Sequence, residues 1–485
     1  MRMTDAALPG RWPEPRTCRV LAWGLAAVMA ATVCYSLVRI PLQVTDSLVP
    51  MLDAQHTPSV AAAMIRSAGT TSYLRPLRAA QIQALFELSN GHYFLAYKGF
   101  HVLLVMACFA LFVLVVDAGV PARVAALPFA LTVLTGLHTF RGTVWEAYPV
   151  NHSLEVVGFC LLALVLCQSR GGRWADAGAA LIFLAASLTV ESGLLVWVVV
   201  ATAWLCGARG VSTRGLLVVT ALLAGYLWFR FDHLATGVPA LSERSSGFGL
   251  RQLDPGEIMR RFGERPYVFY AYNVASSFLS VLFSEPRAGI WTIPAELARG
   301  RVAAGTAINV AASTVTTLLI AWFVAGRRHA WRQRRFERDD QIVVVALAVV
   351  LANAVISYGY TKDEILGPGG AFYSLAAFVA LAAALQRAPG LAPRRPTLAA
   401  AWGLVLALTS CAWVERAIGL HYQMNLIAFY DRNEWVYVDD WLRTQQAAPA
   451  TDAGRALVGQ LREEALEGAS VNPYLLSPRL DQWFR

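Results

Sequence analysis

The segment Thr71–Leu104 reads TSYLRPLRAAQIQALFELSNGHYFLAYKGFHVLL and joins the first two long apolar runs of the chain. After a turn, its apolar residues recur at helical spacing, with glutamine and glutamate on other faces. This pattern predicts an amphipathic helix that lies in the membrane interface and begins near Pro76. Arg75 and Arg78 flank that proline, at the depth where lipid phosphates lie.

The composition is typical of a polytopic membrane protein. Of the 485 residues, 56% are hydrophobic and 15% charged, and the mean hydropathy is +0.48. The net charge of +9 does not indicate a nucleic-acid partner, because the basic residues cluster in short loops between apolar runs. All basic residues except Lys98 and Lys362 are arginine. This bias, together with abundant Ala, Val and Leu, indicates GC-rich bacterial coding.

Apolar runs long enough to approach the thickness of a bilayer predict about 11 spans. They lie near residues 20–40, 99–119, 122–138, 152–168, 175–190, 193–208, 215–231, 305–325, 341–360, 371–386 and 398–416. The arginine-rich loops predict the orientation, since positively charged loops stay in the cytoplasm. The strongest is Arg327–Arg338, and it falls inside only if Tyr267–Phe283 forms a non-spanning aromatic hairpin on the outer surface. The N-terminus is then cytoplasmic, the C-terminus extracytoplasmic, and the location the bacterial inner membrane.

The prediction is therefore an all-α integral membrane fold with interfacial helices in a long first extracytoplasmic loop, residues 41–98. That loop belongs to a membrane core spanning residues 20–235. The predicted divisions of the rest of the chain are a cytoplasmic N-terminus (1–19), an extracytoplasmic loop (236–304), the C-terminal spans (305–416) and an extracytoplasmic tail (417–485). The tail contains two predicted helices, Val438–Gln446 and Ala453–Glu467.

The sequence contains no motif for a disulfide, a metal site or a nucleotide-binding loop. The seven cysteines lie in or beside apolar runs without a CxxC pair, which is typical of buried small residues. The histidines and acids show no metal-ligand spacing, so no metal or other cofactor is predicted, although a divalent cation in a site assembled by the fold is compatible with the sequence. The stretch Leu366–Gly370 (LGPGG) is interpreted as a turn, and no phosphate-binding loop is present.

The polar residues gather at the predicted outer ends of the spans, which favours an enzyme acting on a lipid head group over a transporter with a midplane site. Asp46 follows the first span; it is either a general base for an acceptor hydroxyl or a helix cap. Glu146 is the second candidate base or a substrate-orienting acid, or a plain loop residue. Trp145 and Tyr148 beside it could stack on a sugar. Glu191 interrupts an apolar run, either as a turn residue or as an acid facing the site.

Four arginines are candidates for binding a donor phosphate through paired hydrogen bonds. The alternative for each is a side chain that reaches the interface without a ligand. The four are Arg75, Arg78, Arg141 and Arg230.

The order of these features over residues 20–235 resembles the GT-C membrane glycosyltransferases, including the TMTC-type proteins and the protein O-mannosyltransferases. Tyr73–Leu77 is similar to the family's Tyr-Arg-Pro-Leu motif, and Leu137-His138 to its Leu-His-Pro. The resemblance implies that Asp46 is the catalytic base, that Arg230 contacts the donor phosphate, and that Glu191 and His138 shape the site. The chain departs from the family at Thr139, in place of proline, and lacks a tetratricopeptide-like tail.

The sequence thus predicts a glycosyltransferase that moves a sugar from a polyprenyl-phosphate donor to an extracytoplasmic acceptor, with membrane lipids as its other partners. Two alternatives stay open. A lipid-linked glycan flippase or transporter would place polar residues through the membrane. A surface-polysaccharide polymerase or ligase would use an arginine-bearing outer loop, and residues 232–304 contain Arg244, Arg251, Arg260 and Arg261.

Overall fold

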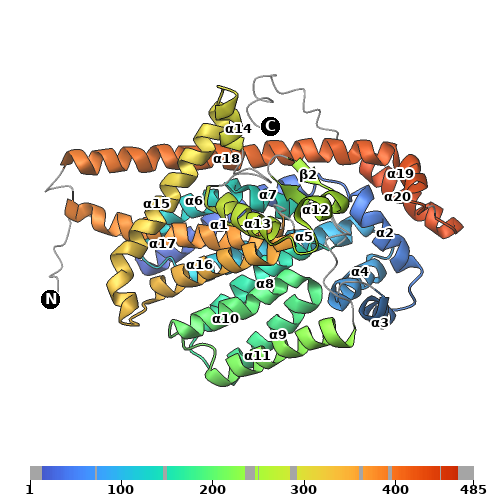
Figure 1. Cartoon of the computed structure of the whole chain (residues 1–485), viewed down its shortest axis with the longest axis horizontal. Helices are drawn as coiled ribbons and strands as arrows, with labels where there is room; N and C mark the ends of the chain where they lie inside the picture. Colours follow the sequence, from blue (N-terminus) through green and yellow to red (C-terminus); the bar gives the residue numbers. More distant parts are fainter. Residues whose placement is uncertain are drawn as a thin grey trace.

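In the part of the chain that it describes, the computed structural model contains helices and one short hairpin (Figure 1). The residues it describes are 14–70, 74–145, 150–234, 246–248, 251–283, 292–359, 364–391, 396–447 and 449–467. The hairpin is antiparallel and joins β1 (Ser246–Phe248) to β2 (Arg251–Leu253).

Within the described residues, seven helices are long and apolar enough to cross a bilayer, so the chain is a multi-pass membrane protein. They are α1 (Pro15–Leu37), α5 (Tyr93–Val116), α11 (Thr213–Trp228) with its extension η2 (Phe229–His233), α15 (Ala304–Arg332), α16 (Arg338–Ile356), α17 (Gly367–Leu391) and α18 (Pro396–Val436). A further span would be formed by α6 (Pro121–Gly136) and α7 (His138–Trp145), which together bend by 65°. Each of the 11 predicted spans coincides with a helix, but the count of 11 stays a prediction.

The remaining helices are shorter. Three of them occupy predicted spans, namely α8 (His152–Cys167), α9 (Arg173–Thr189) and α10 (Leu195–Leu205). The others are α2 (Val44–Gln55), α3 (Val60–Thr70), α4 (Pro76–Ser89), η1 (Glu191–Leu194), α12 (Pro255–Phe262), α13 (Tyr267–Phe283), α14 (Thr292–Ala298), η5 (Ser357–Gly359), η6 (Glu364–Leu366), α19 (Val438–Thr444) and α20 (Asp452–Glu467). The two predicted helices of the tail are confirmed by α19 and α20.

The main core lies where α17 is surrounded by α6, α8, α15 and α16. Of its most apolar window, 83% is buried, against 11% for α18, so α17 is the central helix and α18 a peripheral one. On α1 the buried residues Ala22, Ala26 and Ala30 repeat every fourth position. Such small side chains allow the helix backbone to approach α5 and α6 closely, which is how membrane helices gain packing energy.

A second apolar core lies at one end of the bundle, and we call the helices that build it the terminal lobe. Residues of α2, α18, α19 and α20 pack there with Tyr97 at the start of α5. The Trp435 indole donates a hydrogen bond of 2.5 Å to the carbonyl oxygen of Leu42. In Figure 1, α18 runs the length of the molecule, and α2, α3, α4, α19 and α20 gather at its far end. The segment between α1 and α5 and the C-terminal segment after α18 therefore fold together.

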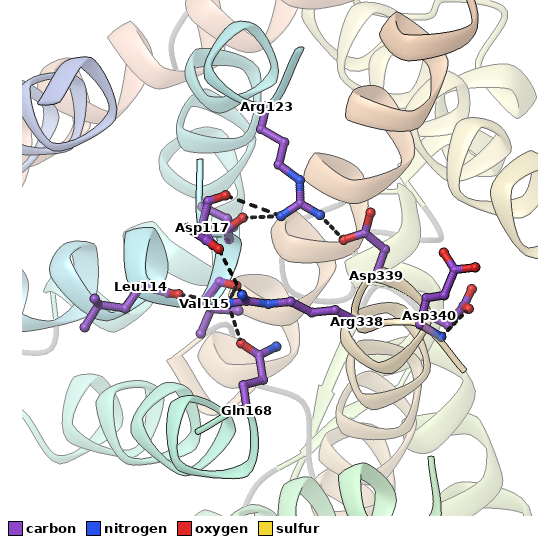
Figure 2. Close-up of polar contacts among 10 residues, drawn as sticks. Leu114, Val115, Asp117, Arg123, Gln168, Arg338, Asp339 and Asp340 are labelled. Atoms are coloured by element: carbon purple, nitrogen blue, oxygen red, sulfur yellow. Dashed lines mark hydrogen bonds and ion pairs between the residues drawn. The ribbon is translucent and has the colours of Figure 1, made fainter. Parts of the chain in front are cut away.

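Ion pairs hold the opposite end, which we call the arginine end. Arg338 lies 3.1 Å from Asp117 and donates to the carbonyl of Val115 at 3.1 Å and to Gln168 at 3.0 Å (Figure 2). Arg123 pairs with Asp339 in the same view. Asp340, which is fully buried, accepts two hydrogen bonds of 2.8 and 2.7 Å from Arg327. These contacts join the ends of α5, α6, α8, α15 and α16.

Four sequence expectations differ from the structure. Residues 267–283 form one continuous helix, α13, and not a hairpin, because no glycine or proline interrupts them. The last predicted span does not end at residue 416: α18 has 41 residues and is about 60 Å long, about twice the hydrocarbon core of a bilayer. The predicted loop at residue 327 is still helical, since α15 continues to Arg332. The predicted turn at Leu366–Gly370 is the end of η6 and the first turn of α17.

Candidate functional site

Glu191 lies in the tight connection between α9 and α10. The chain leaves α9 through Val190 and forms the single turn η1. A Cβ atom on Gly193 would lie 2.1 Å from the carbonyl oxygen of Ala186, so only glycine fits where η1 approaches the end of α9. The turn expected from the sequence is therefore present, and it presents a carboxylate at the end of the bundle that carries α4.

Arg75 reaches this carboxylate from the start of α4. Its Nη2 atom lies 2.5 Å from Glu191 Oε2, and its Nε atom lies 3.3 Å from Oε1. Two parallel contacts of this kind fix the orientation of both planar groups. Arg75 is the N-cap residue of α4, and Pro76 opens that helix as the sequence predicted. The side chains of Arg75 and Glu191 are each 21% exposed.

Arg230 reaches the same carboxylate from the last turn of α11. Its Nη1 atom lies 3.3 Å from Glu191 Oε1 and donates a 2.9 Å hydrogen bond to the Tyr226 hydroxyl. Here the helix widens into the π turn η2, a distortion that is frequent at functional sites. The Arg230 side chain is 5% exposed. We call Arg75, Glu191, Arg230 and Tyr226 the arginine–glutamate cluster.

The cluster brings two guanidinium groups to one carboxylate. Burial tends to raise the pKa of Glu191, but the pairs with Arg75 and Arg230 outweigh it and hold that pKa below the ordinary value. Glu191 is therefore ionised at neutral pH. Guanidinium groups are also well suited to bind anionic ligands such as phosphate.

A second polar group lies along the same helix, and we call it the α4 row. Arg78 and Gln81 follow Arg75 at intervals of three residues, so they lie on neighbouring parts of the α4 surface. Gln81 donates a 2.9 Å hydrogen bond to Oε1 of Glu155, near the start of α8. Arg78 is close enough to act on the Glu155 carboxylate electrostatically. Glu155 itself is only 3% exposed.

For some of the other predicted site residues, the structure gives only the helix on which they lie, or does not describe them. Asp46 lies in the first turn of α2, a helix that packs against α4, but its side chain is outside the described part. Glu146, Tyr148 and the side chain of Trp145 also lie outside the described residues. The last two predicted site residues, His138 and Arg141, occupy α7, which packs against α8 and α17.

The described side chains contain no group of three or more His, Cys, Asp or Glu residues arranged to hold a metal ion. Of the arginines between α11 and α15, Arg261 pairs with Glu257 one helical turn away. That contact is typical of an exposed helix surface.

Two residues of this region, Glu155 and Tyr226, were not predicted from the sequence. Glu155 lies inside the predicted span 152–168, so its charge within an apolar run was the signal that marks it. Tyr226 had no such signal, since an aromatic residue near a membrane interface is ordinary.

Comparison of the chain with protein-family models, with curated proteins and with solved structures gives no match. The assignment of function therefore rests on the residues and their arrangement.

Proposed function

We propose that the protein is a glycosyltransferase of the bacterial inner membrane, which takes a sugar from a polyprenyl-phosphate donor and gives it to an acceptor on the extracytoplasmic side. The observation that supports this best is the convergence of Arg75 and Arg230 on Glu191. These residues come from three separate segments, and their side chains bring two guanidinium groups together at one end of a membrane bundle.

The chemistry of such a transfer matches this charge. The bond between the sugar and the carrier phosphate breaks as the acceptor oxygen bonds to the sugar, and the phosphate leaves with the bonding electron pair. Arginines that stabilise the developing negative charge lower the barrier, and they do so most effectively when they are already fixed in place. Glu191 and Tyr226 fix Arg230 in this way.

The acceptor hydroxyl must lose a proton in the same reaction. Asp46 is the proposed base, since a carboxylate near the acceptor can take that proton. It is on α2, beside the helix that carries Arg75. Glu146 is the second choice for this role. The other candidate groups are Arg78 and Arg141 for the donor phosphate and His138, Trp145 and Tyr148 for the walls of the site.

The test uses purified full-length protein in lipid vesicles with undecaprenyl phosphate that bears radiolabelled glucose, mannose or galactose. We expect the wild type to release the carrier or hydrolyse the donor, and Asp46→Asn to abolish turnover while donor binding persists. Arg230→Ala should weaken donor binding. Arg338→Ala is the matched control, because this arginine lies at the arginine end and should leave both unchanged. Turnover that survives Asp46→Asn would contradict the assignment of the base.

A lipid-linked glycan flippase is the second candidate, and one observation favours it. The helix α13 buries Asn273, Ser276 and Ser277 within the bundle. Asn273 Oδ1 and both serine hydroxyls have no hydrogen-bond partner among the residues that the structure describes. Unsatisfied polar groups are costly inside a membrane and often mark a path for a polar substrate. Movement of a fluorescent lipid-linked sugar between leaflets, preserved in Asp46→Asn, would favour this function over transfer.

A further inference from the structure

Glu155 is a buried carboxylate with one unused oxygen. Only 3% of the residue is exposed, and Oε1 accepts the hydrogen bond from Gln81. Oε2 has no hydrogen-bond partner within the described ranges of the chain. A buried acceptor without a partner lowers the stability of the fold, and more so when it is charged. This cost to stability indicates that Glu155 has a function other than stabilising the fold.

The α4 row connects Glu155 with the arginine–glutamate cluster. Arg75 and Gln81 are six residues apart on α4, so the rise along the helix between them is about 9 Å. Arg75 bonds to Glu191 at one end of this row, and Gln81 bonds to Glu155 at the other. Arg78 lies between them. In addition, α8 packs directly against η1, so the two carboxylates belong to adjacent segments.

The two ends of this row differ in chemistry. The arginine–glutamate cluster presents two guanidinium groups, which are suited to binding a phosphate. Glu155 presents a carboxyl oxygen that bonds to no described residue, and such an oxygen accepts hydrogen bonds from hydroxyl groups. A ligand that satisfies both ends therefore has an anionic group and, a short distance away, a neutral group rich in hydroxyls. A sugar attached to a phosphate has this composition.

We propose that Glu155 is a substrate-binding residue of the same site, and that its Oε2 atom accepts a hydrogen bond from a hydroxyl group of the sugar. Gln81 acts as a positioning residue, since its side-chain amide donates a hydrogen bond to the other oxygen of the same carboxyl group. This inference rests on the proposed function for the identity of the sugar donor, but it makes a separate statement about which residue the sugar touches.

The first experiment is independent of turnover. Dicyclohexylcarbodiimide, a hydrophobic reagent that modifies carboxyl groups in membrane proteins, is added to the full-length protein in vesicles between pH 5 and 8, and the modified residues are identified by mass spectrometry. We expect modification of Glu155, at least fivefold slower in the presence of undecaprenyl phosphate bearing glucose, mannose or galactose. Undecaprenyl phosphate without a sugar should protect less. Modification at an equal rate with every carrier, or none at Glu155 at any pH, overturns the proposal.

The controls use the same helix and the same type of residue. Glu87 lies on α4, and its Oε1 accepts a hydrogen bond from Gln83. The variant Glu87→Gln should leave the protection of Glu155 unchanged, whereas Gln81→Ala should reduce it. Loss of protection in Glu87→Gln but not in Gln81→Ala would count against the α4 row.

The second experiment separates the two proposals by kinetics on the donor that the wild type accepts. We expect Glu155→Gln to raise KM at least tenfold, and Glu155→Asp, which keeps the charge, to recover part of this loss. Unchanged KM in Glu155→Gln overturns the inference and leaves the transferase proposal standing. The opposite outcome is sugar-dependent protection of Glu155 without turnover on any donor. It would support Glu155 as a sugar-binding residue and count against the glycosyltransferase proposal.

Discussion

The two ends of the bundle use arginine differently. At the arginine end, Arg338 bonds to Asp117, to Gln168 and to the carbonyl oxygens of the last turn of α5, and Arg123 pairs with Asp339 (Figure 2). Arg327 pairs with Asp340. At the other end, Arg75 and Arg230 contact the same glutamate. The helix α5 separates the two groups, since its first turns pack near α4 and its last turn ends beside Asp117.

We infer from this difference that the charged residues of the arginine end stabilise the fold, whereas those of the arginine–glutamate cluster and the α4 row bind a ligand. At the arginine end, arginines form ion pairs with aspartates and donate hydrogen bonds to helix-terminal carbonyl oxygens. These contacts hold several helices together. In the arginine–glutamate cluster two arginines instead share one glutamate, and in the α4 row Oε2 of Glu155 has no hydrogen-bond partner among the described residues. Substitutions at the first end should mainly change stability, and those at the second should mainly change binding and turnover.

The largest effect on stability is expected at Asp340. Its carboxylate is fully buried, bonds twice to Arg327 and accepts a 2.8 Å hydrogen bond from the backbone of Glu337 at the start of α16. Asp340→Ala should lower the free energy of unfolding by about 3–4 kcal/mol. Chemical denaturation in detergent would measure this. The neighbouring Asp339→Ala is the control and should cost less, because Asp339 is 30% exposed. A loss of donor binding with unchanged stability would contradict the structural role.

Glu191→Ala should cost about 2–3 kcal/mol, because it leaves the buried Arg230 facing Arg75 without the shared carboxylate. Inorganic phosphate should restore part of the thermal stability of this variant by binding between the two arginines. It should not stabilise Asp340→Ala in the same way. Equal responses of the two variants would show that the ends do not differ.

The pH dependence of Glu191 has a definite sign. Its pKa is lower in the folded protein than in the unfolded chain, so its contribution to stability is present at neutral pH and is lost as the pH falls below the ordinary glutamate range. The difference in stability between the wild type and Glu191→Gln should therefore shrink on acidification from about pH 5 to pH 3. A difference that grows over this range would refute the ion pair. Thermal melts at a series of pH values would measure it.

Arg230→Ala should weaken the binding of undecaprenyl phosphate about tenfold to a hundredfold, which corresponds to about 1.5–3 kcal/mol for hydrogen bonds to a charged group. Equilibrium binding in nanodiscs would show this. Tyr226→Phe is a milder companion variant, since it removes only the hydroxyl that accepts from Arg230. An affinity unchanged in Arg230→Ala would exclude this arginine from the phosphate site.

The smallest effect is expected for Arg338→Ala. Arg338 and Asp117 are each 40% exposed, and partly exposed pairs contribute about 0.2–1 kcal/mol. Salt should reduce the difference from the wild type further, because it screens exposed charges. A cost as large as that of Asp340→Ala would mean that the arginine end is held by Arg338 and not by its buried aspartate.

The positions of the helices could be predicted from the sequence because a membrane span requires a continuous run of apolar residues, which is visible locally. The apolar runs give helices at each predicted position, and Pro76 gives the start of α4. Boundaries were less predictable. The helix α18 continues for 20 residues past residue 416, since its polar C-terminal half is stabilised by packing with α2 and α20 in the terminal lobe. Long-range packing of this kind leaves no periodic signal strong enough to locate the end of a helix.

The sequence by itself determined that this is a helical membrane protein with polar residues between its apolar runs, and it named Arg75, Glu191 and Arg230 as separate candidates. Only the tertiary structure decided that these three meet, because their contacts join residues 39 and 116 positions apart and depend on how α4, α9 and α11 pack. It alone singled out Glu155, since a charge at the edge of an apolar run becomes significant only when its burial and its single partner are known.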